Sequence, residues 1–370
     1  MPDAPVDDNA DETPEAQAET PKERDLLITE DNTFGTELED ALRRDFTING
    51  LFYDPVRGRV IDHVNGLRDL AAEQIRTIGD PEQRMREDPV RILRAVRFAG
   101  KLGFDIEPRT YAAMEGSIED LPRCSAPRLL EETFRLIRGG GASPALKLLL
   151  ALDGLAHLLP PVNDYLAEQD ADGQAEYFKS VAEMDALVNA GTSFDDSMLL
   201  ACILLPIALD EPDAPEAPQA AAAQAAAPAG DGASPPEAPV APPANEGADA
   251  ERPPSVARAI ELLLSELVRS ARLPRRIAER CRMILLSQKT LAGLRRRRGG
   301  LSGFRSHPLF KESLAVFEVW VRATGEHQAA LDAWKSGTSP AVAADAEGPR
   351  RRRRRRRRGG GGGERPQAAE

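Results

Sequence analysis

Three low-complexity segments limit how much of this chain can fold around a core. Residues 1–24 contain almost no large apolar side chain, and residues 336–370 include nine consecutive arginines followed by five glycines. Between them, residues 211–254 hold 16 alanines and 11 prolines, and the interspersed prolines exclude a long helix. Such compositions bury too little apolar surface to offset the entropy of ordering. We therefore expect these segments to be disordered and the fold to consist of residues 25–210 and 255–335.

The net charge of −12 averages over segments of opposite sign. The first 40 residues hold 14 acidic and 2 basic side chains, whereas residues 251–322 hold 16 basic and 6 acidic ones. An acidic total disfavours a nucleic-acid partner, but these basic stretches favour RNA or another polyanion, with a solvated helix face as the alternative. The arginine runs expected to bind RNA are Arg295, Arg296, Arg297 and Arg298, and Arg350, Arg351, Arg352, Arg353, Arg354, Arg355, Arg356, Arg357 and Arg358.

Cysteine usage and hydropathy exclude several classes of protein. Cys124, Cys202 and Cys281 lie more than 70 residues apart, so neither a zinc site nor a disulfide framework is expected. No run of 18 apolar residues occurs, and the acidic N-terminus lacks the basic and apolar parts of a signal peptide. The sequence thus predicts a cytoplasmic protein with no membrane partner.

Apolar periodicity predicts helices for most of the remainder. LLEETFRLIRGGG places apolar residues at helical spacing and ends on Gly139–Gly141, a helix stop. Strand patterns are confined to residues 59–64 and 74–78, and Gly66 between them marks a turn where backbone must approach closely. The expected fold class is a long all-α region preceded by an incomplete α/β unit. Further helical stretches are expected at 145–161, 180–188, 197–209, 255–273 and 275–294.

The segment after Glu87 predicts a helix with one basic and one apolar face. Asp88 is a good N-cap residue, and Pro89 would then stand at the first helical position. A stripe of guanidinium groups there suits a triphosphate or a base edge, although a surface ion-pair network is the simpler alternative. The stripe comprises Arg91, Arg94, Arg97 and Lys101, and the face expected to be buried comprises Ile92, Leu93, Val96 and Ala99.

Residues 43–49, RRDFTIN, form a second dense polar group. Asp45 could cap a short helix through Phe46–Phe52, which would place Asn49 on the same face. Asp and Asn side chains can accept from and donate to a ribose hydroxyl, with Arg43 and Arg44 near a phosphate. A simple ion pair between Asp45 and Arg44 is equally compatible with the spacing.

The order of RRDFTING, DHVNGLRDL and IRTIGDPEQRMREDPVRILRAVRFAGKLGF closely resembles the class II tRNA nucleotidyltransferase and bacterial poly(A) polymerase superfamily. DNTFGTELEDALRRDFTING, SAPRLLEETFRLI, FRSHPLFKESLAVFEVWVRATGEH and the arginine-rich tail look like the poly(A) polymerase branch. The resemblance covers residues 31–334 apart from the 211–254 insertion. It implies a head remnant at 25–78, a neck with a nucleobase-reading helix at 79–110, a helical RNA-binding body at 111–210 and 255–335, and disordered segments at 1–24, 211–254 and 336–370.

The resemblance implies template-independent addition of AMP from ATP to RNA 3′ ends, with RNA rather than DNA as the partner. A CCA-adding tRNA nucleotidyltransferase and a non-catalytic RNA-binding derivative of the family are the alternatives. Gly50 stands where the family usually has Ala or Ser. Carried over by motif, the ribose-contacting element is Arg44, Asp45 and Asn49 beside Arg43, and the nucleobase-reading element is Glu87, Asp88, Arg91 and Arg94.

The chain departs from the family pattern upstream of Arg43. Family members carry a Gly-Gly loop, a DxD pair and a third carboxylate that hold two Mg²⁺ ions, and residues 1–42 contain no such motif. Asp170 and Asp172 form a DxD, but in a polar stretch downstream of the family position. We therefore expect no catalytic or metal-binding residue in this chain and no primer extension by it alone. A head segment supplied by another chain is one way in which activity could be restored.

Overall fold

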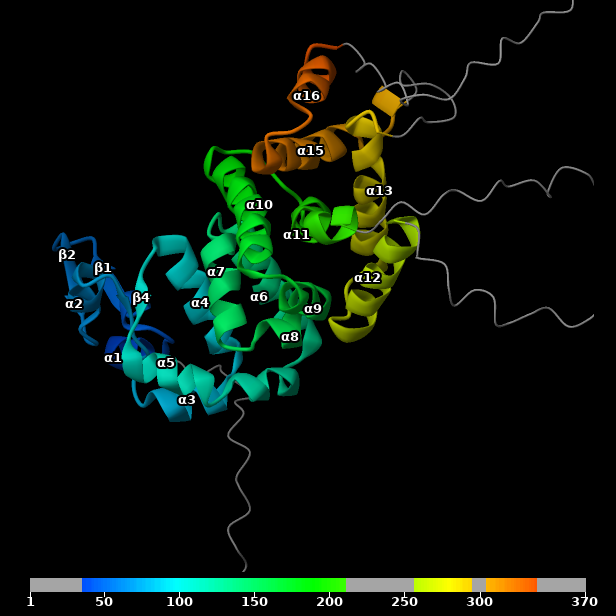
Figure 1. Ribbon diagram of the computed structural model, residues 1–370. Helices are drawn as coiled ribbons and strands as arrows, with labels where there is room; N and C mark the ends of the chain where they lie inside the picture. Colours follow the sequence, from blue (N-terminus) through cyan, green and yellow to red (C-terminus); the bar gives the residue numbers. More distant parts are fainter. Residues whose placement is uncertain (1–34, 211–255, 295–303, 338–370) are drawn as a thin grey trace, which may run out of the picture.

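The computed structural model describes residues 35–210, 256–294 and 304–337 (Figure 1). Within these ranges the chain is mostly helical, with two small sheets near its N-terminal end. Among the helices described there, none is long and apolar enough to cross a membrane. The segments expected to be disordered fall outside these ranges, except for Ser336 and Gly337, as do all the arginines expected to bind RNA.

The N-terminal part contains two separate two-stranded sheets. Strands β1 (Leu51–Asp54) and β2 (Arg59–Asp62) form an antiparallel hairpin, and β3 (Gln74–Ile75) pairs in parallel with β4 (Asp105–Ile106). The two strands expected from the sequence are present but shorter than expected. The sequence patterns gave no indication of β1 and β4.

The helix expected from Phe46 to Phe52 is wrong. A single 3₁₀ turn, Thr47–Asn49, occupies its start, and β1 follows directly. Backbone pairing explains the difference, since Thr47 N donates to the Arg76 carbonyl at 2.9 Å and Ile78 N donates to the Asp45 carbonyl at 3.0 Å. These non-local bonds draw the segment towards residues 74–78 and away from a helix.

Gly66 lies where the backbone of two segments meets, as the sequence predicts. It begins helix α2 (Gly66–Ala71), directly after Asn65, whose φ of 63° is left-handed. A Cβ atom at Gly66 would lie 2.2 Å from the carbonyl oxygen of Thr47. Only glycine therefore allows α2 to pack against the 3₁₀ turn.

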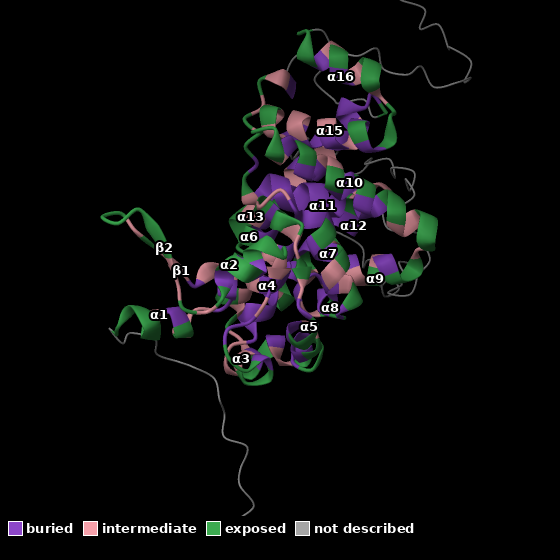
Figure 2. Ribbon diagram, turned by 90° about the vertical axis from the view of Figure 1, so that its left-hand side faces the viewer, coloured by how far each residue is buried: buried purple, intermediate pink, exposed green. Residues whose placement is uncertain are grey.

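The outer side of this N-terminal part exposes large apolar side chains. Figure 2 shows α1 (Glu37–Arg43) and the β1–β2 hairpin projecting from the helices with mostly exposed residues. A two-stranded hairpin has little stability of its own, so this part depends on Phe46 and Ile75, which are fully buried in the main core. The exposed large apolar residues here are Leu38, Leu42, Tyr53, Val56, Val60, Leu67 and Leu70.

Helices form the rest of the described chain. Helix α11 is apolar on all sides and lies at the centre of the body, against α10, α13 and α15, as expected of a helix with no polar face. A second, smaller core joins α15 and α16, where Trp334 Nε1 donates to the Leu291 carbonyl at 2.8 Å. The helices are α3 (Pro81–Glu87), α4 (Val90–Leu102), α5 (Pro108–Glu115), a 3₁₀ helix (Ile118–Arg123), α6 (Ala126–Arg138), α7 (Ala142–Ala151), α8 (Leu155–Leu158), α9 (Pro160–Glu168), α10 (Ala171–Asn189), α11 (Asp196–Asp210), α12 (Val256–Ser270), α13 (Arg275–Leu291), α15 (Phe310–Thr324) and α16 (Gln328–Lys335).

Helix α4 crosses α7 in direct backbone contact. A Cβ atom on Gly100 would lie 2.6 Å from the Gly141 carbonyl oxygen and 2.9 Å from the Ala145 Cβ. The face of α4 expected to be buried is buried, with Ile92, Leu93 and Val96 fully enclosed. Small residues at the crossing therefore let the helix that carries the basic stripe sit close to the body.

We predict that Gly100→Ala lowers the free energy of unfolding by about 2 kcal/mol, the usual scale of overpacking. The clash with backbone outweighs the gain of about 1 kcal/mol in helix propensity. Gly116→Ala is the matched control, because its Cβ would meet nothing closer than 3.5 Å. Urea denaturation measures both variants, and equal midpoints would contradict the prediction.

Glu107 links α5 to strand β3. It caps α5 by accepting from Thr110 N at 2.8 Å, and Arg76 Nη1 lies 3.1 Å from its other carboxylate oxygen. Burial acts to raise the pKa of Glu107, but hydrogen bonds from Thr110 and Arg109 and the charge of Arg76 hold that pKa below its usual value. The carboxylate therefore stabilises the fold above the ordinary pKa, and this contribution is lost as pH falls through the lowered one.

We accordingly predict that Glu107→Gln destabilises the fold at neutral pH and that the difference from the parent shrinks below about pH 4. Thermal denaturation across pH measures this effect. The exposed Glu115 of the same helix provides a control, and Glu115→Gln should show no such pH dependence. A constant difference between the Glu107 variant and its parent at all pH values would show that the charge has no role.

Candidate nucleotide-binding cleft

An open cleft of about 1050 Å³ lies between the N-terminal part and helices α4 and α6. It gathers seven of the eight residues expected to bind a nucleotide, from segments about 40 residues apart in sequence. Glu87 does not line it. The lining residues are Gly35, Thr36, Glu37, Asp40, Arg43, Arg44, Asp45, Asn49, Phe52, Asp88, Arg91, Arg94, Phe98 and Arg128.

Asp45 joins the two motifs across the cleft. One carboxylate oxygen accepts from Phe46 N at 2.9 Å and from Asn49 Nδ2 at 3.0 Å. The other accepts from Arg94 Nε at 2.6 Å. Asp45 is 6% exposed, whereas the Arg94 side chain is 37% exposed, so only the carboxylate end of this charge-assisted bond is shielded from water. Asp45 thus pairs with Arg94 of α4, and the simple Asp45–Arg44 pair is not formed.

Arg44 is held by three different contacts. Its Nη1 donates to the Asn49 carbonyl at 2.7 Å, and its Nη2 donates to Asp40 at 3.0 Å. Its guanidinium also stacks over the Phe52 ring, with the central carbon 4.6 Å from the ring centroid. Phe52 reaches this position because it belongs to β1 rather than to a helix, a contribution that the sequence patterns did not indicate.

Asp88 does not cap α4, contrary to expectation. Pro89 precedes the helix, α4 begins at Val90, and no side-chain cap bond forms. One oxygen of Asp88 instead accepts from Arg128 Nη2 of α6 at 2.9 Å. The other, Oδ1, is buried with no hydrogen-bond partner. The hydrogen-bonding capacity of this oxygen is unmet, and because the oxygen is buried, a donor that enters the cleft reaches it only after the surrounding side chains shift.

Arg91 lies beside Asp88 with its side chain 11% exposed. Its Nη1 donates to the Arg84 carbonyl at 2.6 Å and to Glu87 at 3.3 Å. Burial and the nearby Arg84 lower the pKa of Arg91, while Asp88 and Glu87 oppose this shift. A guanidinium with so high an intrinsic pKa stays charged, so the cleft holds a fixed donor next to the free acceptor.

The rest of the expected stripe divides between the cleft and the body. Arg97 is partly buried, with its Nε 3.5 Å from Glu132 of α6 and its guanidinium over the Phe98 ring. Lys101 is exposed near the end of α4. The stripe therefore serves two purposes, since Arg91 and Arg94 line the cleft and Arg97 fastens α4 to α6.

Arg84 and Glu87 support the cleft from behind. Arg84 Nη2 donates to the carbonyl oxygens of Arg43 and Arg44 at 2.8 and 2.7 Å. Glu87 accepts from both Arg84 and Arg91, at 3.2 and 3.3 Å. Glu87 therefore orients arginines and does not face the cleft. Nothing in the sequence spacing points to Arg84, because its partners lie about 40 residues away.

Metal ligands are not found in the part of the chain that the structure describes. No group of three or more His, Cys, Asp or Glu side chains there could hold a metal ion. Asp170 caps α10, with an oxygen 2.9 Å from Gly173 N, which accounts for the first acid of the downstream DxD without a metal. The described residues thus offer no site that fits the Mg²⁺ ions expected from the family resemblance.

We predict that Arg84→Ala lowers both stability and nucleotide affinity, because two backbone carbonyls lose their charged donor, at a cost of about 1.5 to 3 kcal/mol. Arg86, exposed on the same helix, provides a matched control. Thermal denaturation and titration with a fluorescent ATP analogue measure the two effects. If Arg84→Ala behaves like Arg86→Ala in both assays, Arg84 does not position the cleft.

Two protein-family models match segments that contribute residues to this cleft, and the residues between the two matches, which include Asp88, Arg91 and Arg94, lie in neither. The model described as Poly A polymerase head domain matches residues 7–76, and the one described as Probable RNA and SrmB- binding site of polymerase A matches residues 103–166. The first match begins inside the segment expected to be disordered. Over these two segments the chain is similar to the head domain and to the RNA-binding region of poly(A) polymerases.

Individual relatives include both poly(A) polymerases and CCA-adding enzymes. Poly(A) polymerase I of Escherichia coli O6:H1 is 44% identical over 142 residues, which is 38% of this chain and 30% of that protein. The CCA-adding enzyme of Bacillus pumilus is 41% identical over 113 residues, 30% of this chain and 28% of that protein. The match therefore spans less than a third of the length of either relative.

Solved structures share the fold over a longer stretch. The CCA-adding enzyme of Bacillus stearothermophilus in complex with CTP aligns with a TM-score of 0.52 at 22% identity, covering 82% of this chain and 59% of that one. A structure described as tRNA-processing enzyme complex 3 aligns with a TM-score of 0.51 at 18% identity, covering 83% and 70%. At this identity the likeness concerns the fold alone.

Proposed function

We propose that this chain supplies the nucleotide-selecting and RNA-holding parts of a template-independent nucleotidyltransferase that adds AMP from ATP to RNA 3′ ends. The observation that carries the proposal is the buried, unpartnered Oδ1 of Asp88 next to the Arg91 guanidinium in the cleft. The family matches over segments that contribute residues to the cleft and the Asp45–Arg94 bond that joins the two motifs support it.

The acceptor and donor at Asp88 and Arg91 match the edge of particular bases. Adenine and cytosine each present an amino group beside a ring-nitrogen acceptor, so a carboxylate and a guanidinium side by side pair with both. Guanine and uracil present the reverse order on that edge, which would set acceptor against acceptor. The pair therefore selects ATP and CTP over GTP and UTP by hydrogen bonding.

The other cleft residues fit the remainder of a nucleotide. Asn49 and Asp45 lie within hydrogen-bond distance of one another and offer a donor and acceptors to a ribose. Arg43 and Arg44 stand at the head side of the cleft, where a triphosphate would meet their charge. Phe52 and Phe98 provide apolar surfaces at its wall. These roles rest on the residues present and require no group from outside the described chain.

We predict that the purified chain binds ATP at least about tenfold more tightly than GTP or UTP, the scale of one well-formed hydrogen-bond pair. Asp88→Asn should reduce this ratio, because the amide can present a donor where the carboxylate presents only acceptors. Calorimetric titration measures the four affinities. Asp172→Asn, an exposed acid of α10, is the control. Equal affinity of the unmodified chain for all four nucleotides would refute the proposal.

CCA addition to tRNA is the second candidate, because the donor and acceptor pair fits cytosine as well as adenine and a relative named a CCA-adding enzyme matches the same region. Comparable affinities for CTP and ATP would favour this candidate, whereas a clear preference for ATP favours poly(A) addition. A third outcome, RNA binding with no nucleotide binding, would favour a non-catalytic RNA-binding protein.

A further inference from the structure

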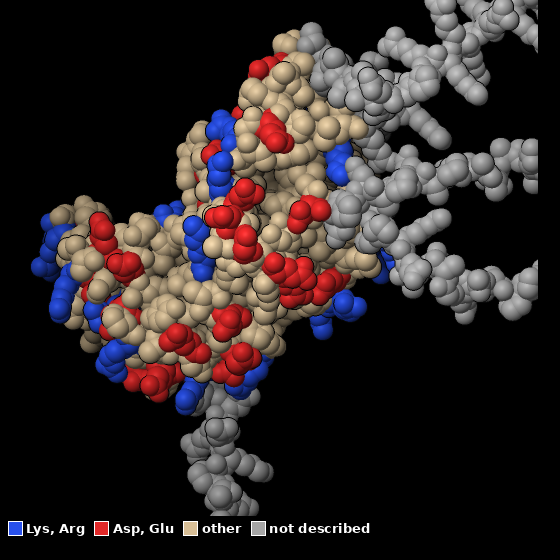
Figure 3. All heavy atoms as spheres, viewed as in Figure 1, with Lys and Arg blue, Asp and Glu red and all other residues tan. Residues whose placement is uncertain are grey.

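Four arginines crowd the turn between α12 and α13. Arg269, Arg272, Arg275 and Arg276 are all exposed. In the view of Figure 3, basic side chains gather at the lower end of α12. Ion pairs in these two helices involve Arg258, Arg280 and Arg282, and Glu279 is held by Arg282. Among the described residues, no ion pair neutralises the four arginines of this turn.

Arg272 holds an unfavourable backbone conformation. Its φ is 52°, in the left-handed region, and it directly precedes Leu273, whose N–H bonds to the Leu267 carbonyl at 3.3 Å to close α12. Glycine is the usual residue at such a helix end, and a residue with a side chain costs about 1 kcal/mol or more there. The Arg272 side chain is exposed at this end of α12.

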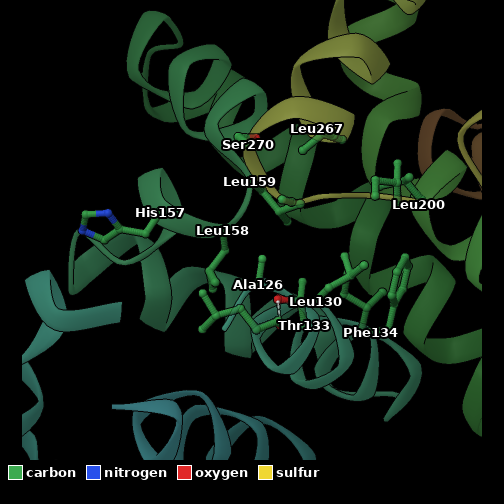
Figure 4. Close-up of a pocket in the computed structure, with 14 residues that line it drawn as sticks. Ala126, Leu130, Thr133, Phe134, His157, Leu158, Leu159, Leu200, Leu267 and Ser270 are labelled. Atoms are coloured by element: carbon green, nitrogen blue, oxygen red, sulfur yellow. Dashed lines mark hydrogen bonds between the residues drawn. The ribbon is translucent and has the colours of Figure 1, made fainter. Parts of the chain in front are cut away.

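Helix α6 separates the turn from the nucleotide cleft. Figure 4 shows a small hollow in which Ala126 and Leu130 of α6 face Ser270 and Leu267 of α12. Arg128, in the same first turn of α6 as Ala126, lines the nucleotide cleft. The hollow and the cleft thus lie on either side of one helix, whose diameter with side chains is about 10 to 12 Å.

The hollow itself is too small to hold a nucleobase. Its volume is about 40 Å³, and apolar side chains from α6, α8, α11 and α12 and the residues next to them line most of it. The apolar side chains around the hollow therefore hold the arginine turn against α6. Any ligand at this surface would bind to the guanidinium groups above the hollow and not inside it.

The chemistry of the turn favours RNA over a protein partner. The centre of a protein interface is typically apolar. In the described part of α12 and α13, Leu262 is the only large hydrophobic residue that is exposed. Closely spaced guanidinium groups without acidic partners match the repeated charges of a phosphate backbone. We propose that the α12–α13 turn binds phosphates of the RNA segment that runs upstream from the 3′ end in the cleft, an inference that rests on the proposed function.

The test compares RNA affinity in variants of the full chain. Replacing the four arginines by glutamine should weaken binding of a fluorescent oligoadenylate at least tenfold at low salt. It should also lower the slope of log affinity against log salt by up to about 3, at roughly 0.7 for each phosphate contact. Arg272→Gly should leave the fold as stable or more stable and still weaken RNA binding. As a control, Arg322→Gln removes an arginine that is paired with Glu318 on α15, and it should not weaken RNA binding.

Two further readouts locate the effect. RNA should slow amide hydrogen exchange in residues 266–278, which separates this site from the arginine-rich C-terminal sequence. The affinity for ATP should not change in the variants. The inference would be overturned if RNA affinity, salt slope and amide exchange were all unchanged. It would also be overturned if the variants lost binding to an acidic protein but still bound RNA. If the chain binds RNA through this turn but no ATP, the proposed function fails and the turn remains an RNA site.

Discussion

The bond between Asp45 and Arg94 is the contact on which the cleft depends. It joins a residue of the N-terminal part to a residue of α4, with a donor–acceptor distance of 2.6 Å. Asp45 is buried, while the Arg94 side chain is 37% exposed. Because each partner belongs to a different motif, the bond brings the two sides of the cleft together. Removing Arg94 would leave Asp45 as a buried, uncompensated charge, which is costly in protein interiors.

Electrostatics around the cleft follow from an excess of guanidinium groups. Asp40, Asp45 and Asp88 each already accept a bond from an arginine. Arg43 and Arg91 are also paired with acidic side chains, at 3.9 and 3.3 Å, so the positive charge left for a polyanionic ligand is the excess of five arginines over four acids in the cleft lining. The cleft is preorganised because buried or stacked contacts hold its arginines in place before any ligand arrives. This arrangement limits the entropy that a nucleotide must lose on binding.

Local patterns predicted most of the helices and singled out residues that line the cleft, but the family resemblance assigned the roles of those residues, and nothing in the sequence indicated how they are held. The apolar spacing of α4 was sufficient to identify Ile92 and Val96 as buried, because helical periodicity is a property of neighbours in sequence. Asp88 followed the pattern of an N-cap yet bonds to Arg128, 40 residues later. Phe52 lay in an expected helix but pairs with Ile61 in a strand. In each case a non-local partner outweighed the local preference. A single sequence does not show which distant residues become partners in the fold.

The glycine contact between α4 and α7 has a mechanical consequence. Since backbone meets backbone at Gly100 and Gly141, no layer of side chains is available there to slide or repack. Helix α4 and the body are therefore expected to move as one rigid unit, and the arginines of α4 that line the cleft travel with it. Any hinge between the two sides of the cleft has to lie on the N-terminal side of α4. There, polar bonds and the buried side chains of Phe46 and Ile75 hold the N-terminal part, so closure around a ligand would move that part towards a stationary α4.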